Sequence, residues 1–117
     1  MIDDDLTSAR ILIVDDQPAN VRLLERLLRR AGYTALTGTT DPRRVMPLFS
    51  ASEPDLVILD LHMPHLDGFA LMQALGPAIP RDTYLPLLVM TADITAEAKQ
   101  RALVMGAKDF LTKPFDT

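Results

Sequence analysis

The sequence predicts an α/β domain whose parallel sheet is covered by helices on both faces. Short apolar runs rich in Val, Ile and Leu alternate along the chain with segments whose apolar residues recur at helical spacing. The runs are apolar throughout, which is typical of parallel strands that are buried on both faces. A chain of 117 residues has the length of one domain with a single core.

Composition narrows the class of protein. Hydrophobic residues make up 48% of the chain, and the net charge of −4 gives no support for nucleic-acid binding. The sequence contains no cysteine, which excludes disulfides and thiolate chemistry. No apolar run approaches the ~18–20 residues of a membrane span, and the acidic start does not resemble a signal peptide. We therefore expect a cytoplasmic protein that does not bind membranes.

The chain begins with an expected tail over residues 1–9, and the domain follows over 10–117. The apolar run 10–14 predicts a buried strand that ends at two carboxylates. Pro18 suits the first position of the helix that follows.

The first predicted helix is amphipathic. Its apolar stripe, at spacings of three and four residues, consists of Val21, Leu24, Leu28 and Ala31. Its other side carries Arg22, Arg26, Arg29 and Arg30. We interpret these arginines as a solvated face rather than a phosphate-binding patch. Gly32 is expected to end the helix.

The next strand is predicted over 33–38, with a weaker composition that is typical of a sheet edge. Asp41 and Pro42 form a good helix start, as cap and first helical residue. Pro47 lies inside that helix, where it removes a backbone hydrogen bond, so we expect the helix to be kinked or short.

The second half of the chain continues the alternation. Strands are predicted over 55–60, 85–91 and 108–112, with helices over 67–75 and from a cap at Asp93 or Thr95 to about Met105. Five strands and four helices are thus expected.

Polar residues stand at the carboxyl ends of four of the five predicted strands. They are Asp15, Asp16, Asp60, Thr91 and Lys113. In an open parallel sheet, the carboxyl ends of the strands meet at one edge, where binding sites form. Three carboxylates at one place repel each other, so a divalent cation is expected, and Mg²⁺ (or Mn²⁺) suits such oxygen ligands. A lysine beside them can contact a phosphoryl oxygen.

These residues lie in five short motifs whose order along the chain matches a known pattern. The motifs are Ile-Val-Asp-Asp at 13–16, Leu-Asp-Leu-His-Met-Pro at 59–64, Asp-Gly at 67–68, Met-Thr-Ala at 90–92 and Lys-Pro-Phe at 113–115. Their order and spacing resemble the receiver domain of two-component response regulators, over residues 10–115. The resemblance implies a flavodoxin-like five-stranded sheet in the order 2-1-3-4-5.

The resemblance also implies the roles of individual residues. Asp60 would accept a phosphoryl group from a sensor histidine kinase or a phosphotransfer protein. Mg²⁺ would be held by Asp15, Asp16, Asp60 and the backbone carbonyl of His62. The protein would then be a signalling phosphoacceptor that promotes its own phosphorylation and dephosphorylation, rather than an enzyme.

The resemblance also implies which residues assist the reaction, which act as the switch and which tune its timing. Thr91 would donate its hydroxyl to the phosphoryl group, and Lys113 would neutralise its charge. Phe110 would turn inward when Thr91 moves. His62 and Asp93 would flank the path of hydrolytic water and so set the lifetime of the phosphorylated state.

Simpler explanations exist for single residues. Asp15 and Asp16 could cap the first helix, Thr91 could be an ordinary strand-end residue, Lys113 a surface lysine and Phe110 a core residue. A metal site built from His62 and His65 is rejected, because three carboxylates favour Mg²⁺ over a metal that prefers imidazole.

Other classes of protein share parts of the pattern. A Mg²⁺-dependent phosphatase of the haloacid dehalogenase type also uses an Asp nucleophile, but in an Asp-x-Asp pattern after its first strand. A flavin-binding domain would need a phosphate-binding loop where Asp15 and Asp16 stand. A binding module that works without phosphorylation is a third alternative.

The sequence ends at Thr117, before the last helix that receivers normally have. Such a helix would bury about five large apolar side chains at about 1.5–3 kcal/mol each. We therefore expect the isolated chain to be marginally stable, or to be covered by following sequence or by a second copy in a homodimer. The domain that would carry out the response could be an enzyme or a DNA-binding domain, and both alternatives are kept.

Overall fold

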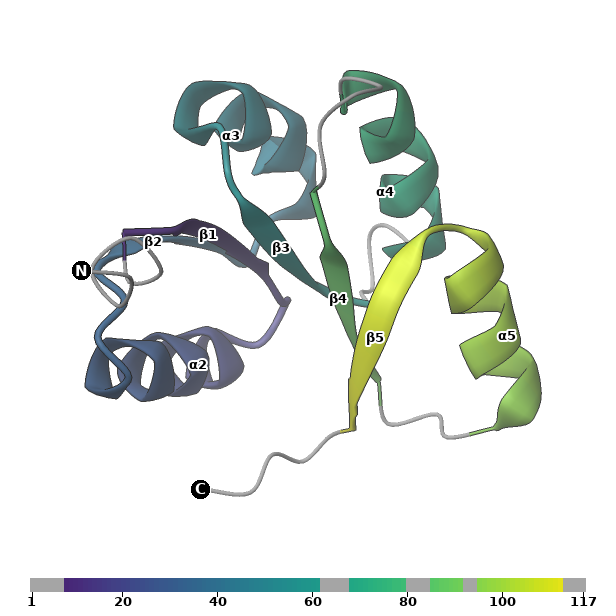
Figure 1. The fold of residues 1–117 in the computed structure, drawn as a ribbon, viewed down its shortest axis with the longest axis horizontal. Coiled ribbons are helices and arrows are strands. Elements are labelled where there is room, and N and C mark those ends of the chain that lie inside the picture. The colour runs from purple at the N-terminus through teal and green to yellow at the C-terminus, as the bar shows by residue number, and fades with distance from the viewer. Residues whose placement is uncertain (1–7, 62–67, 80–84, 92–94, 113–117) are drawn as a thin grey trace.

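The chain folds into a five-stranded parallel sheet with helices on both faces (Figure 1). The computed structural model describes residues 8–61, 68–79, 85–91 and 95–112, and of residues 110–112 it describes the backbone. The strand order is β2-β1-β3-β4-β5, and each neighbouring pair is parallel. The predicted flavodoxin-like fold and strand order are confirmed. In the described part of the chain, no helix is long and apolar enough to cross a membrane.

Strands and helices alternate along the chain as predicted. The strands are β1 (Arg10–Val14), β2 (Ala35–Thr39), β3 (Leu56–Asp60), β4 (Leu87–Thr91) and β5 (Ala107–Thr112). The α-helices are α2 (Pro18–Arg30), α3 (Val45–Ser52), α4 (Gly68–Leu75) and α5 (Ala96–Val104). Two short 3₁₀ turns, η1 (Pro42–Arg44) and η2 (Gly76–Ala78), precede α3 and follow α4.

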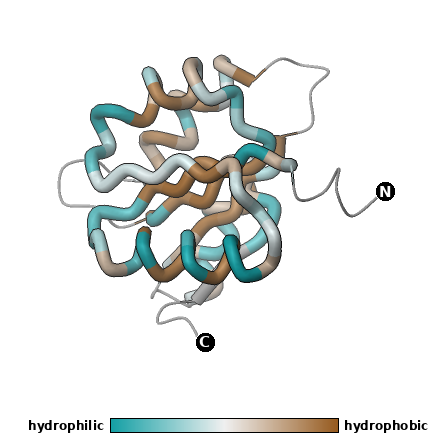
Figure 2. Tube along the Cα trace, turned by 90° about the vertical axis from the view of Figure 1, so that its left-hand side faces the viewer, coloured by the Kyte–Doolittle hydropathy of each residue, from teal (hydrophilic) through white to brown (hydrophobic). Residues whose placement is uncertain are grey.

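The two faces of the sheet support two separate apolar clusters. On one face, α3, α4 and α5 pack on residues of β1, β3 and β4 that include Leu12, Val57 and Val89. On the other face, α2 packs on the alternate residues of the same strands, such as Ile13 and Ile58. Figure 2 shows the hydrophobic strands enclosed between the helices. Because successive side chains of a strand point to opposite faces, continuous apolar strands are what this arrangement requires.

Local sequence explains where the helices begin and end. Pro18 occupies the start of α2, and Gly32 adopts a positive φ of 102° just after the helix. Asp41 caps η1 through its side chain, which accepts a hydrogen bond from Arg43 N. Pro47 lies in the first turn of α3, where it removes no helical hydrogen bond, and the helix is short as predicted. Thr95, rather than Asp93, is the cap of α5.

Candidate functional site

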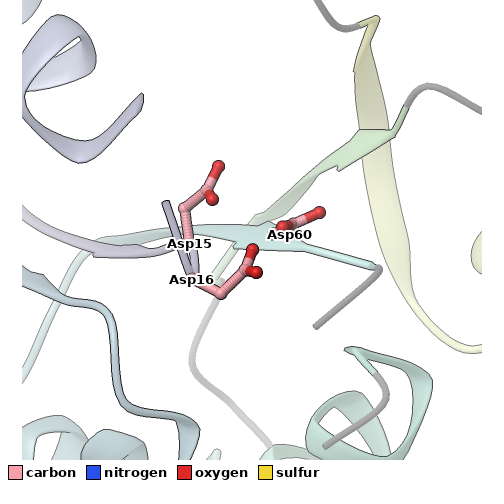
Figure 3. Close-up of side chains that lie close together, drawn as sticks. All are labelled: Asp15, Asp16 and Asp60. Carbon is pink, nitrogen blue, oxygen red and sulfur yellow. The ribbon is translucent and has the colours of Figure 1, made fainter. Parts of the chain in front are cut away.

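Three carboxylates meet at the carboxyl edge of the sheet. Val14 and Leu59 are paired in the register of β1 and β3, so the next residues, Asp15 and Asp60, come out of the sheet at the same level. Ligand oxygens of Asp15, Asp16 and Asp60 all lie within 4.8 Å of one another. Figure 3 shows the three side chains at the ends of the two strands. The predicted convergence of these carboxylates is therefore observed.

Asp15 is held in place by the backbone around it. Its Oδ1 accepts a hydrogen bond from Gln17 N at 2.9 Å, at the turn into α2. Its own N donates to Thr39 O at 3.2 Å, at the end of β2. The side chain is fully buried. Asp15 thus fixes the turn that leads into α2 and at the same time presents its carboxylate to the cluster. It does not cap the helix, because the N-cap residue of α2 is Gln17 and no side chain caps that end.

Asp60 is the last residue of β3 and is 1% exposed. The chain just beyond it is fixed from two directions. Leu61 N donates to Met90 O of β4 at 3.1 Å, and Leu61 O accepts from Gly68 N at 2.9 Å. A Cβ atom on Gly68 would lie 2.5 Å from Asp60 O, far inside van der Waals contact. The first turn of α4 therefore rests directly on the backbone that carries Asp60.

The electrostatics of the cluster favour a cation. Asp15 and Asp60 are buried and Asp16 is half-buried, so their mutual repulsion is only weakly screened by water. Oδ2 of Asp15 and Oδ2 of Asp60 are buried and accept no hydrogen bond, although both side chains have other interactions. Three carboxylates form an all-oxygen donor set of the kind that suits Mg²⁺. The residues present therefore fit a hard divalent ion.

Thr91 ends β4 on the same edge and is 2% exposed. Asp60 pairs with Met90, so Thr91 lies one residue beyond the level of Asp60 on the neighbouring strand. Phe110 pairs with Val89 across β4 and β5, and its side chain is outside the described part. The other predicted site residues, His62, Asp93 and Lys113, also lie outside the described residues.

Gly68 and Thr39 are site residues that sequence reasoning did not identify. The Asp-Gly pair at 67–68 marked a helix start, but nothing in it signals contact with the end of β3. Thr39 contributes through its backbone oxygen, which any residue possesses. Both contacts join segments that are distant in sequence, so they become visible only in the fold.

Comparison with known proteins matches nearly the whole chain to one family. The model of the response regulator receiver domain matches residues 11–117. Response regulator PleD of Caulobacter vibrioides is 39% identical over 109 residues, which cover 93% of this chain and 24% of PleD. Transcriptional regulatory protein PrrA of Mycobacterium bovis is 34% identical over 114 residues, which cover 97% of this chain and 47% of PrrA. The chain thus spans less than half of these relatives.

Solved structures agree with the sequence comparison. Chemotaxis protein CheY4 of Vibrio cholerae superposes with a TM-score of 0.85 at 28% identity, covering 93% of this chain and 89% of that one. A signal receiver domain from Bermanella marisrubri gives a TM-score of 0.79 at 33% identity, with 93% and 88% covered.

Proposed function

Because the chain belongs to the response regulator receiver family, we propose that Asp60 is its phosphoacceptor and that phosphorylation requires Mg²⁺. The observation that carries this proposal is the cluster of Asp15, Asp16 and Asp60 at the carboxyl edge of the sheet. The donor would be a phosphohistidine on a sensor histidine kinase or on a phosphotransfer protein.

The proposed reaction is a displacement at phosphorus. An oxygen of Asp60 attacks, the new O–P bond forms as the P–N bond to the donor histidine breaks, and the leaving imidazole takes up a proton. Asp15, Asp16 and Asp60 would hold the ion, together with the backbone carbonyl of His62. When bound, Mg²⁺ neutralises the charge of the transferring group. The buried backbone around Asp60 keeps its carboxylate oriented while the reaction proceeds.

The remaining predicted residues complete the proposal. Thr91 would donate its hydroxyl to the phosphoryl group, and its burial at the end of β4 beside β3 supports that role. Lys113 would supply a positive charge, and Phe110 would respond to the movement of Thr91.

His62 and Asp93 would set how long the phosphoryl group persists. Substituting His62 and Asp93 together should change the dephosphorylation rate. An unchanged rate would show that these two residues do not set the lifetime of the phosphorylated state.

The rival classes are less well supported. A phosphatase of the haloacid dehalogenase type is not favoured by comparisons in which the receiver family covers residues 11–117. A module that binds without phosphorylation would have no need for a buried carboxylate cluster, which is costly to fold. We propose that the domain passes the phosphorylation signal to another domain, to a partner protein or to a second copy of itself.

Mass spectrometry after incubation with acetyl phosphate tests this function. With Mg²⁺ the chain should gain one phosphoryl group, and with EDTA it should gain none. Asp60→Asn should abolish the gain. Asp55→Asn is the matched control, because Asp55 precedes the amino end of β3 and is half exposed. A phosphoryl group on the Asp60→Asn protein, or none on the unsubstituted chain, would refute the proposal.

A further inference from the structure

An arginine of α5 covers a buried aromatic ring of α4. The guanidinium carbon of Arg101 lies 4.0 Å from the centroid of the Phe69 ring. Arg101 is exposed and Phe69 is only 6% exposed, so the guanidinium group forms part of the cover over the ring. α4 and α5 are neighbours on one face of the sheet (Figure 1), and both contribute to the apolar cluster there. The contact therefore joins the two helices above their shared core.

The sequence offers Arg101 a different partner on its own helix. Glu97 precedes it by four residues, and an acidic residue in that position pairs favourably with a basic one on a helix. Among the side chains that the structure describes, however, none forms an ion pair with Arg101. A cation over the face of an aromatic ring is attracted by the electrons of the ring. The position of the guanidinium group on Phe69 is thus not a by-product of pairing with Glu97.

Phe69 stands next to the residue on which the end of β3 rests. That residue is Gly68, whose N donates to Leu61 O at 2.9 Å. A Cβ atom on Gly68 would lie 2.5 Å from Asp60 O, so the start of α4 and the end of β3 have no spare room between them. Phe69 and Leu61 also belong to the same apolar cluster. A displacement of the Phe69 ring would therefore be passed through Gly68 to the backbone that carries Asp60.

The backbone under Arg101 is itself fixed on the sheet. Its chain neighbour Ala102 is fully buried in the apolar cluster beneath α5. Arg101 O accepts a hydrogen bond from Met105 N at 3.1 Å, which closes the last turn of the helix. The guanidinium group thus holds the Phe69 ring from an anchored position.

We propose that Arg101 is a positioning residue for the phosphorylation of Asp60 and that it acts through Phe69. This inference rests on the proposed function of Asp60. From α5, Arg101 holds the Phe69 ring in the core and so holds the first turn of α4 against the end of β3. Attack on phosphorus requires the Asp60 carboxylate to be aligned within a narrow range. When the start of α4 is loosened, the backbone of Asp60 samples other orientations and the reaction slows.

A purely structural contact predicts a different result. It would lower the stability of the whole domain, and all protected amides would then exchange with solvent faster to the same extent. A positioning role predicts a local change at the Gly68 amide, whose hydrogen bond to Leu61 O joins α4 to the end of β3. The amide of Asp55, which donates to Arg10 O at 2.7 Å before the amino end of β3, is the reference.

Three variants on α5 test the inference. Arg101→Gln removes the cation, Arg101→Lys keeps one, and Lys99→Gln is the matched control. Lys99→Gln removes the same charge from the same helix, and residues two apart do not share a helix face. A fourth variant, Phe69→Leu, removes the ring.

Three measurements are made on these proteins. In NMR spectra, the ring current of Phe69 should shift the side-chain protons of Arg101 upfield, and Phe69→Leu should abolish this shift. Hydrogen exchange compares the amides of Gly68 and Asp55. Mass spectrometry follows the rate of phosphorylation by acetyl phosphate at a fixed concentration of Mg²⁺.

Arg101→Gln should speed exchange at Gly68 relative to Asp55 by about two- to fivefold and slow phosphorylation by a similar factor, which is what an exposed cation–π contact is worth. Arg101→Lys should lose less of the rate, and Lys99→Gln none of it. In a chain that already carries Phe69→Leu, adding Arg101→Gln should have no further effect, because the contact is then absent.

Four results would overturn the inference. They are an unchanged rate in Arg101→Gln, an equal loss in Lys99→Gln or in Arg101→Lys, additive effects of Arg101→Gln and Phe69→Leu, and exchange that speeds equally at Gly68 and Asp55. If the unsubstituted chain gained no phosphoryl group, the function of Asp60 would be refuted instead. Exchange at Gly68 would still decide whether Arg101 holds the start of α4.

Discussion

Gly68 controls how closely α4 approaches the end of β3. Its backbone does not have the positive φ that would require glycine; the reason for glycine is space. A methyl group there would meet Asp60 O and the Leu61 Cα, both at 2.5 Å. These are backbone atoms, so the clash cannot be relieved by a side-chain rotation. Either α4 or the end of the strand has to move.

Gly68→Ala should therefore affect stability and site together. We expect the free energy of unfolding to fall by about 1–3 kcal/mol, the usual cost of overpacking, and phosphorylation by acetyl phosphate to slow. Urea unfolding and mass spectrometry measure the two effects. Gly76→Ala is the matched control, because a Cβ atom there meets nothing within 4 Å. If Gly68→Ala had normal stability and normal phosphorylation, the first turn of α4 would not rest on the backbone of Asp60 and Leu61.

At the level of elements, α2 approaches the edge strand β2 most tightly where Val21 meets Gly38. The side chain of Val21 lies over Gly38, and the branched Val side chain is stiff at χ1. A new methyl group on Gly38 of β2 would push α2 away from the sheet.

Gly38→Ala should destabilise the chain by about 1 kcal/mol or more, and this cost should shrink when Val21 is also Ala, since the space is then restored. Urea unfolding of both single variants and the double variant measures the coupling. Strictly additive effects would show that the two residues do not press on each other.

The starts of β1 and β3 are joined by Asp55. Its carboxylate accepts a hydrogen bond from Arg10 N at 2.9 Å and contacts the Arg10 guanidinium at 3.5 Å. The backbone hydrogen bond from Arg10 lowers the pKa of Asp55 below its ordinary 3.8, and desolvation opposes this in part. A carboxyl whose pKa is lowered by folding stabilises the folded state above its unfolded pKa, and this contribution is lost as the pH falls through the folded value.

We therefore expect Asp55 to stabilise the chain at pH 6 and to contribute less and less below pH 3.8. The contribution is about 1 kcal/mol or less, because the group is half exposed and screened by solvent. Unfolding of the unsubstituted chain and of Asp55→Ala, measured from pH 6 to pH 3, should give curves that converge at the acid end. A difference that persists unchanged would contradict the lowered pKa.

For the whole molecule, the sequence predicted the sheet because its three central strands β1, β3 and β4 are nearly continuous apolar runs. Asp60 was visible because it ends such a run. The edge strand was predicted two residues early at its start, at 33 rather than Ala35, because its composition carries little signal. The Gly38 and Gly68 contacts could not be predicted, since each depends on how distant segments pack. The arginines of α2 were interpreted as a solvated face, and their exposure agrees with that interpretation.

The carboxylate cluster links the site to the stability of the entire sheet. Asp15 and Asp16 follow β1, and Asp60 ends β3, so their repulsion acts between two central strands. Unit charges about 4 Å apart repel by about 4 kcal/mol at an effective dielectric constant of about 20. Without a divalent ion, Asp60→Asn should therefore be more stable than the unsubstituted chain, by about 1 kcal/mol or more.

Mg²⁺ should reverse that order. An ion bound only by the folded chain stabilises it by about 2.7 kcal/mol at 100 times its Kd, and the variant has lost one of the three carboxylates that we propose bind it. Thermal unfolding at increasing Mg²⁺ concentration should raise the Tm of the unsubstituted chain and of Asp55→Ala, and raise that of Asp60→Asn much less. If Mg²⁺ stabilised all three equally, the ion would be acting elsewhere on the surface, and the cluster would be a cost to folding without compensation from a bound cation.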